Sequence, residues 1–234
     1  MKLLAIDSSG LVASVAILVD DSILAEYSVN YKKTHSETLM PMINEIVKIT
    51  EFDIKELNAI AVAGGPGSFT GLRIGSATAK GMAQVLDIPI INVPTVDALA
   101  YNLWGNSDYI VPMMDARRNQ TYTGIYEIDK EGRLIAKMEQ SAISVEELAQ
   151  KINEFDRNVV ILGDGVERFK NAMDELLKVE HRYAPANMNR QRASSVALLG
   201  VQYYKAGKYT SAAAHTPVYL RKSQAERERE EKNA

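Results

Sequence analysis

The chain has 234 residues, of which 46% are hydrophobic and 24% are charged, and its formal net charge is −3. This length and balance are typical of a globular protein with one or two domains, and they exclude a disordered chain, a collagen-like repeat and a fibre. There is no cysteine, which excludes a disulfide framework, a thiolate zinc site, an iron–sulfur cluster and a cysteine nucleophile. The first apolar run ends at Asp7 and is too short for a signal peptide or a membrane span, so we expect a cytoplasmic protein without a membrane partner.

The elements of the first half follow from its hydrophobic pattern. Three β-rich runs separated by turn residues predict a three-strand meander, and a helical period follows after a capping box formed by Thr34 and Glu37. A glycine-rich loop then joins an apolar strand to a helix built of small residues. The expected elements are strands at 3–7, 13–19 and 23–29, a helix at 35–50, a strand at 59–63, a loop at 64–71, a helix at about 72–86 and a strand at 88–93.

The second half repeats this order. Ser144 and Glu147 form a second capping box, and glycines again follow the fourth strand. The expected elements are strands at 110–114, 121–128 and 134–142, a helix at 145–155, a strand at 159–162, a turn at 163–165 and a helix at 166–177. An aspartate ends the first strand of each half, at Asp7 and Asp115. A duplicated mixed α/β lobe is the simplest explanation.

The remaining residues complete the predicted domain organisation. A last helix is expected at about 193–206, a short extended segment at 216–221 and a charge-rich, frayed or solvated helix at 224–234. We therefore expect an amino-terminal lobe at 1–106 with the helix at 193–207 packed back on it, and a carboxy-terminal lobe at 107–192. An extended segment with a charged tail at 208–234 would follow.

One segment is strongly basic. Residues 182–222 contain no Asp or Glu and seven basic side chains, namely Arg182, Arg190, Arg192, Lys205, Lys208, Arg221 and Lys222. These charges either spread over different faces or form a basic patch for nucleic acid or an acidic partner.

The glycine loop is a candidate phosphate site, because glycines ahead of a helix expose backbone N–H groups. The standard fingerprints are incomplete, since no Lys-Ser or Lys-Thr follows and Thr70 stands where a dinucleotide motif has its third glycine. Gly65, Gly67 and Ser68 are therefore candidates for contact with a nucleotide. Tight packing of the strand against the helix explains the same glycines equally well.

The two strand-ending aspartates are the candidates for holding a hydrated metal beside a nucleotide, as in two-lobed phosphotransferases. Ser9 follows Asp7 closely and is included as nucleotide-proximal. Capping of the following turn explains Asp7 and Asp115 as well. The three histidines are far apart in sequence, so no helical metal pair is expected, and Ser68 lacks the context of a nucleophile elbow. We predict no catalytic residue and no metal ligand.

The helices at 35–50 and 72–86 carry apolar or small residues on two sides. One side suits the sheet of the lobe, and the other suits a further helix pair, because small residues let helix backbones approach closely. The alternative is that both sides are buried within this chain. The candidate interface residues are Leu39, Met40, Ile43, Val47, Arg73, Ala77, Lys80 and Gly81.

Four stretches resemble the bacterial TsaB (YeaZ) family. They are Ile-Asp-Ser-Ser at 6–9, Gly-Gly-Pro-Gly-Ser-Phe-Thr-Gly-Leu-Arg-Ile-Gly at 64–75, Asp-Ala-Arg at 115–117 and Pro-Val-Tyr-Leu-Arg at 217–221. The resemblance extends from residue 1 to about residue 222. It implies an α/β fold of the duplicated, two-lobed actin-like ATPase type (actin, Hsp70, sugar kinases; ribonuclease H-like), with a reduced second lobe.

The resemblance also implies a function. The family member would be a non-catalytic subunit of the complex that transfers a threonylcarbamoyl group to adenosine 37 of tRNAs reading ANN codons. It would form a heterodimer with its paralogue TsaD, a ternary complex with the ATPase TsaE, and a competing homodimer, and would meet tRNA only through the complex. No tightly bound cofactor is implied, and ATP or ADP would bind at the partner interface.

The catalytic paralogue carries a His-x-x-x-His metal motif that this chain lacks. The corresponding segment, 93–99, has Thr95 and Leu99 in those places, and neither replaces an imidazole ligand. Gly-Asp-Gly at 163–165 is a reduced form of the adenosine loop of kinase-like relatives.

Two other functions stay open. One is a self-sufficient nucleotide-dependent phosphotransferase using Asp7 and Asp115, which ATP turnover by the isolated chain would favour. The other is an M22-like metallopeptidase, which a stoichiometric metal would favour.

Overall fold

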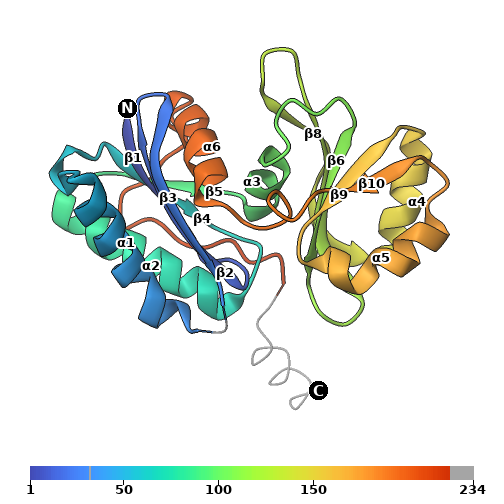
Figure 1. Cartoon of the computed structure of the whole chain (residues 1–234), viewed down its shortest axis with the longest axis horizontal. Helices are drawn as coiled ribbons and strands as arrows, with labels where there is room; N and C mark the ends of the chain where they lie inside the picture. Colours follow the sequence, from blue (N-terminus) through green and yellow to red (C-terminus); the bar gives the residue numbers. More distant parts are fainter. Residues whose placement is uncertain (32, 222–234) are drawn as a thin grey trace.

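The computed structural model describes residues 1–31 and 33–221. It has two lobes side by side, each built on a five-stranded sheet (Figure 1). No helix in these residues is both long and apolar enough to cross a membrane. The predicted tail at 224–234, and Lys222 of the basic segment, lie outside the described residues.

The first lobe contains the predicted meander and two parallel strands. Its sheet has the order β3-β2-β1-β4-β5, in which β1, β2 and β3 pair antiparallel while β1–β4 and β4–β5 pair parallel. The strands are β1 (Lys2–Asp7), β2 (Val12–Val19), β3 (Ser22–Asn30), β4 (Ala59–Ala63) and β5 (Ile90–Val93). The helices are α1 (His35–Thr50), α2 (Phe69–Leu86) and α3 (Thr95–Tyr101), with a short 3-10 turn at Ile54–Glu56.

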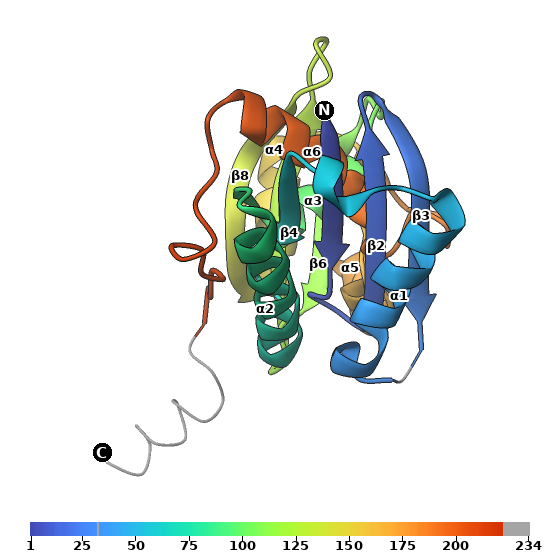
Figure 2. The same ribbon diagram turned by 90° about the vertical axis from the view of Figure 1, so that its left-hand side faces the viewer.

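Alternating side chains of this sheet build two hydrophobic layers. Leu4 and Ile6 of β1 face α1 and α2, whereas Leu3 and Ala5 face the opposite side. That opposite side is covered by α6 (Ala193–Lys205), which packs on β1, β2 and β5. Helix α6 therefore lies on the first sheet although its sequence follows the second lobe, and α1 and α2 lie together on the outer face (Figure 2).

The second lobe repeats the first. Its sheet has the order β10-β9-β6-β7-β8, with β6 in the place of β1. The strands are β6 (Tyr109–Asp115), β7 (Gln120–Ile128), β8 (Leu134–Ser144), β9 (Val159–Leu162) and β10 (His181–Tyr183), and the helices are α4 (Val145–Phe155) and α5 (Gly165–Leu176). The predicted duplication of a two-lobed α/β fold is confirmed.

Several local expectations need correction. Helix α2 begins at Phe69 rather than at about 72, because the Ser68 hydroxyl accepts a hydrogen bond from Gly71 N at 3.2 Å and caps it there. Ser144 caps α4 as expected, accepting from Glu147 N at 3.1 Å. Thr34 does not cap α1, because its hydroxyl donates to the Glu37 carboxylate at 2.8 Å and makes no hydrogen bond to the helix backbone.

Three short elements also differ from expectation. At 216–221, where an extended segment is predicted, the chain is neither helix nor strand, and Val218 N donates to Gly64 O at 2.7 Å. Helix α3, strand β10 and the 3-10 turn were not predicted. Each spans at most seven residues, too few to display a hydrophobic period.

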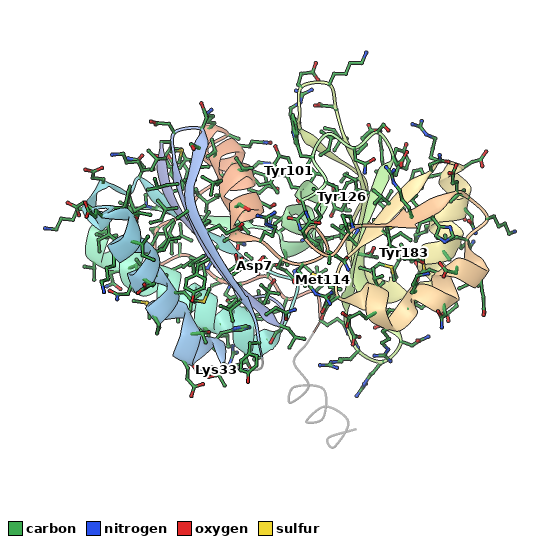
Figure 3. All side chains as sticks on the ribbon, in the orientation of Figure 1. Asp7, Lys33, Tyr101, Met114, Tyr126 and Tyr183 are labelled. Atoms are coloured by element: carbon green, nitrogen blue, oxygen red, sulfur yellow. The ribbon has the colours of Figure 1, made fainter. Side chains whose placement is uncertain are left out.

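A half-buried carboxylate, that of Asp97, joins the two lobes. Asp97 of α3 accepts hydrogen bonds from the hydroxyls of Tyr126 on β7 at 2.8 Å and Tyr203 on α6 at 3.1 Å. Burial raises the pKa of Asp97, while these two hydrogen bonds lower it. Tyr126 lies between the lobes (Figure 3) and is only 1% exposed. This polar contact therefore connects α3 and α6 on the first lobe with β7 of the second.

Removing one of these hydroxyls should destabilise the protein measurably. Tyr126→Phe leaves the carboxylate with one tyrosine donor, and a hydrogen bond to a charged group contributes about 1.5–3 kcal/mol. The free energy of unfolding in urea should fall by that amount. Tyr209→Phe, the same change at a tyrosine that is 47% exposed, is the control and should stay near wild type. Equal stability of both variants would show that the contact contributes nothing.

Candidate functional site

A cleft of about 360 Å³ lies between the lobes. Its walls come from the turn after β1, the glycine loop, the end of β6 and the carboxy-terminal segment. Of the residues predicted to be near a nucleotide, Ser9, Gly67, Ser68 and Asp115 line it. The structure therefore brings these four together from separate parts of the chain.

Asp7 does not reach this cleft. It is fully buried, and its Oδ1 accepts from the backbone N–H of Ser9 at 2.9 Å and from the Ser9 hydroxyl at 2.6 Å. Its Oδ2 has no hydrogen-bond partner among the described residues, and burial raises the pKa of Asp7 to about 6. The contacts of Asp7 are those of a turn cap, and its place beside a nucleotide stays a prediction.

Asp115 occupies the equivalent position in the second lobe and is exposed to the cleft. Its Oδ1 accepts from Arg117 N at 2.8 Å, which is the same turn-capping bond that Asp7 makes. Two guanidinium groups also pair with this carboxylate, that of Arg168 at 3.2 Å and that of Arg117 at 3.7 Å. A metal would compete with both cations. Within residues 1–31 and 33–221 no three His, Asp or Glu side chains come close enough together to hold a metal ion.

Internal contacts use many of the N–H groups of the glycine loop. Gly64 N donates to Val93 O at 2.8 Å, Gly65 N to the Thr95 hydroxyl at 3.1 Å, and Ser68 N to Ser9 O at 2.7 Å. Gly71 N is bonded to the Ser68 hydroxyl, and Pro66 has no N–H. Contacts within the chain therefore engage four of the seven N–H groups of the loop at 64–71.

Close packing explains the glycines themselves. A Cβ at Gly67 would lie 2.3 Å from Ser9 O, and one at Gly71 would lie 2.1 Å from Ser8 O. A Cβ at Gly65 would lie 2.2 Å from Val218 O, because the carboxy-terminal segment crosses the loop there. These contacts favour the packing interpretation of the loop over a phosphate cradle, and they explain why Gly65 does not line the cleft.

The outer face of α1 and α2 holds most of the predicted interface residues. Arg73, Ala77 and Gly81 are exposed, Met40 is 50% exposed, and Lys80 and Val47 are half-buried. Leu39 and Ile43 are only 1% and 3% exposed and belong to the core between α1 and the sheet, so both are corrected from interface to core.

The same face contains an apolar residue that was not predicted. Val85 is 85% exposed and continues the four-residue spacing of Arg73, Ala77 and Gly81 along α2. The four-residue spacing along the helix was the signal in the sequence that could have identified Val85 as an interface candidate. Ile49 of α1 is also 72% exposed. Each of the two helices therefore carries exposed apolar side chains.

Ion pairs within the chain engage three of the arginines in the basic segment. Arg182 pairs with Asp108 at 2.9 Å, Arg190 pairs with Glu167, and Arg192 pairs with Glu26 at 2.5 Å. Their acidic partners belong to both lobes. These contacts favour the interpretation in which the basic charges spread over different faces.

Comparison with known proteins identifies the family. The family model of TsaD, tRNA N6-adenosine threonylcarbamoyltransferase, matches residues 22–229. The tRNA threonylcarbamoyladenosine biosynthesis protein TsaB of Bacillus subtilis is 34% identical over 97% of this chain and 96% of its own length. The protein of the same name from Escherichia coli is 26% identical over 94% and 95%. This chain belongs to the TsaB family.

Solved structures agree with this fold. YeaZ from Pseudomonas aeruginosa superposes with a TM-score of 0.80 at 24% identity, covering 94% of this chain and 99% of that one. The ROK hexokinase of Thermus thermophilus superposes with a TM-score of 0.51 at 13% identity over 88% and 100%. The expected resemblance to the TsaB (YeaZ) family and the actin-like, sugar-kinase-like fold are both confirmed.

In this chain, the two positions of the missing histidine motif have structural roles. Thr95 is fully buried, and its hydroxyl accepts the hydrogen bond from Gly65 N. Leu99 packs in the hydrophobic cluster between α3 and the second sheet. A hydroxyl and an isobutyl group thus occupy core positions here, and neither faces the cleft.

Proposed function

We propose that this chain is a non-catalytic subunit in tRNA threonylcarbamoylation, and that it pairs with TsaD through the outer face of α1 and α2. The main support is the exposed row of Ala77, Gly81 and Val85 on α2, with Met40 and Ile49 exposed on α1. A related protein with the same fold would present a matching helix pair, and the two pairs would form a four-helix bundle. A second copy of this chain would compete for the same face.

The site chemistry supports an accessory role. Asp7 is buried, Asp115 is paired with two arginines, and Thr95 and Leu99 are core residues. These observations weigh against a self-sufficient phosphotransferase and against a metallopeptidase. We place ATP or ADP at the interface with the partner, with no cofactor held tightly by this chain alone. TsaE would join the pair to form a ternary complex in the cytoplasm, and tRNA would be bound through the complex.

An omission assay tests this function. In a complete threonylcarbamoylation mixture with TsaD and TsaE, leaving out this chain should reduce modification of adenosine 37 to background, and adding it back should restore the reaction. The isolated chain should neither modify tRNA nor hydrolyse ATP.

Two outcomes would contradict the proposal. One is full modification without this chain. The other is ATP turnover by the isolated chain that disappears in Asp115→Ala, since Asp115 is the carboxylate of the predicted pair that faces the cleft.

A further inference from the structure

The carboxy-terminal segment at 208–221, here called the strap, runs beside α2 (Figure 2). It begins with a two-bond bridge to the edge of the first sheet, in which Ile90 N donates to Thr210 O at 2.8 Å and Thr210 N donates to Ile90 O at 2.9 Å. It then bonds to Gly64 through Val218 N and ends on the second lobe, where Arg221 donates to Ala116 O at 2.8 Å. The strap is therefore anchored at three separate places.

Between these anchors the strap binds Lys80 of α2. The Lys80 ammonium donates to the backbone carbonyl of Ala213 at 3.3 Å and to that of His215 at 3.1 Å. His215 is itself only 2% exposed, so this part of the strap is packed against the lobe. A lysine that is bonded to two carbonyls of a packed segment has lost most of its rotamer freedom.

The strap also binds Arg73 of α2. The Arg73 guanidinium lies over the Phe69 ring, 3.9 Å from its centroid, and the Phe69 ring packs on Tyr219 with centroids 4.8 Å apart. Arg73 Nε also donates to the Tyr219 hydroxyl at 3.4 Å. Arg73 is thus held by a cation–π contact to Phe69 of its own helix and by a weak hydrogen bond to Tyr219 of the strap, which also packs on the Phe69 ring.

These two cations flank Ala77, a small exposed residue of the helix. On a helix surface, residues three and four apart are neighbours, so Arg73 lies one turn before Ala77 and Lys80 lies nearly one turn after it. Both side chains are long enough to cover a small residue when they are free. In this structure both are engaged by the strap, and a Cβ atom added at Gly81 would meet nothing within 4 Å.

We propose that the strap is a positioning element for the pairing face, holding Arg73 and Lys80 aside so that Ala77 and Gly81 stay accessible to the helices of TsaD. This inference rests on the proposed function and adds to it a role for a segment more than a hundred residues away in sequence. The strap lowers the entropic cost of pairing, because the partner does not have to order these side chains.

A double-mutant cycle tests this role by measuring affinity for TsaD. Tyr219→Ala removes the hydrogen bond from Arg73 to the strap and the ring that packs on Phe69, and it should weaken binding by about three- to tenfold, the cost of ordering one long side chain. Arg73→Ala removes the side chain that the strap restrains. In that background Tyr219→Ala should change the affinity by less than twofold, because nothing remains to be held. Tyr209→Ala, a strap tyrosine without contact to Arg73 or Lys80, is the control and should bind like wild type.

Three other outcomes of these binding measurements would each contradict a different part of the proposal. If Tyr219→Ala weakens binding equally in both backgrounds, Tyr219 acts on the partner or the fold directly and the positioning role is wrong. If Tyr219→Ala has no effect while Ala77→Glu abolishes binding, the pairing face stands and only the strap's role fails. If Ala77→Glu also binds like wild type, the proposed face is wrong and the inference fails with it.

Discussion

Ala77→Glu and Gly81→Arg should each lower the affinity for TsaD, and the affinity of the chain for itself, by orders of magnitude. Both residues are exposed near the middle of α2. A stable interface buries about 800 Å² per partner, and an unpaired charge placed in its centre costs about 3–5 kcal/mol. Since about 1.4 kcal/mol corresponds to a factor of ten, the expected loss is at least a hundredfold.

Neither replacement should disturb the lobe. Ala77 is exposed, and the Cβ of a residue at position 81 has no neighbour within 4 Å. Circular dichroism should therefore match wild type, while analytical ultracentrifugation with and without TsaD should show the loss of association. Asn171→Glu, a charge added to the exposed side of α5 in the second lobe, is the matched control. Well-folded Ala77→Glu that associates at wild-type concentrations would show that these helices are not the contact.

Asp7→Asn should remove a pH-dependent loss of stability. Burial raises the pKa of Asp7 from 3.8 to about 6, so the folded state binds this proton more tightly than the unfolded state does. Protonated Asp7 therefore stabilises the folded protein below about pH 4, and this stabilisation is lost as the pH rises through 6. A shift of roughly two units corresponds to about 3 kcal/mol.

Asparagine retains an acceptor for Ser9 and does not ionise. The free energy of unfolding of Asp7→Asn relative to wild type should therefore increase between pH 4 and pH 7, by up to about 3 kcal/mol. Urea unfolding at intervals across this range measures it, and Asp21→Asn at the exposed β2–β3 turn controls for the loss of one surface charge. Parallel pH profiles for wild type and Asp7→Asn would show that the buried carboxyl does not have the raised pKa.

The elements predicted best are those with a complete local signal. The helix expected at 35–50 has the observed bounds of α1, because its apolar residues recur over several turns. The strand at 59–63 and the helix at 145–155 also have their observed bounds. Strand β10 has three residues and could be found only through the duplication, as the counterpart of β5. Three residues are too few to show the alternation of apolar and polar side chains that identifies a strand.

The sequence by itself determined the duplicated order of elements, the exclusion of cysteine chemistry and, through the motif at 64–75, the family. These features depend on residues close together in the chain, where periodicity, capping and turn residues act. Which side of each helix is covered depends on contacts between distant segments. Only the tertiary structure placed Leu39 and Ile43 in the core, withdrew Asp7 from the cleft and brought the strap to Arg73 and Lys80, because burial and long-range hydrogen bonds arise only when the sheet, helices and strap pack together.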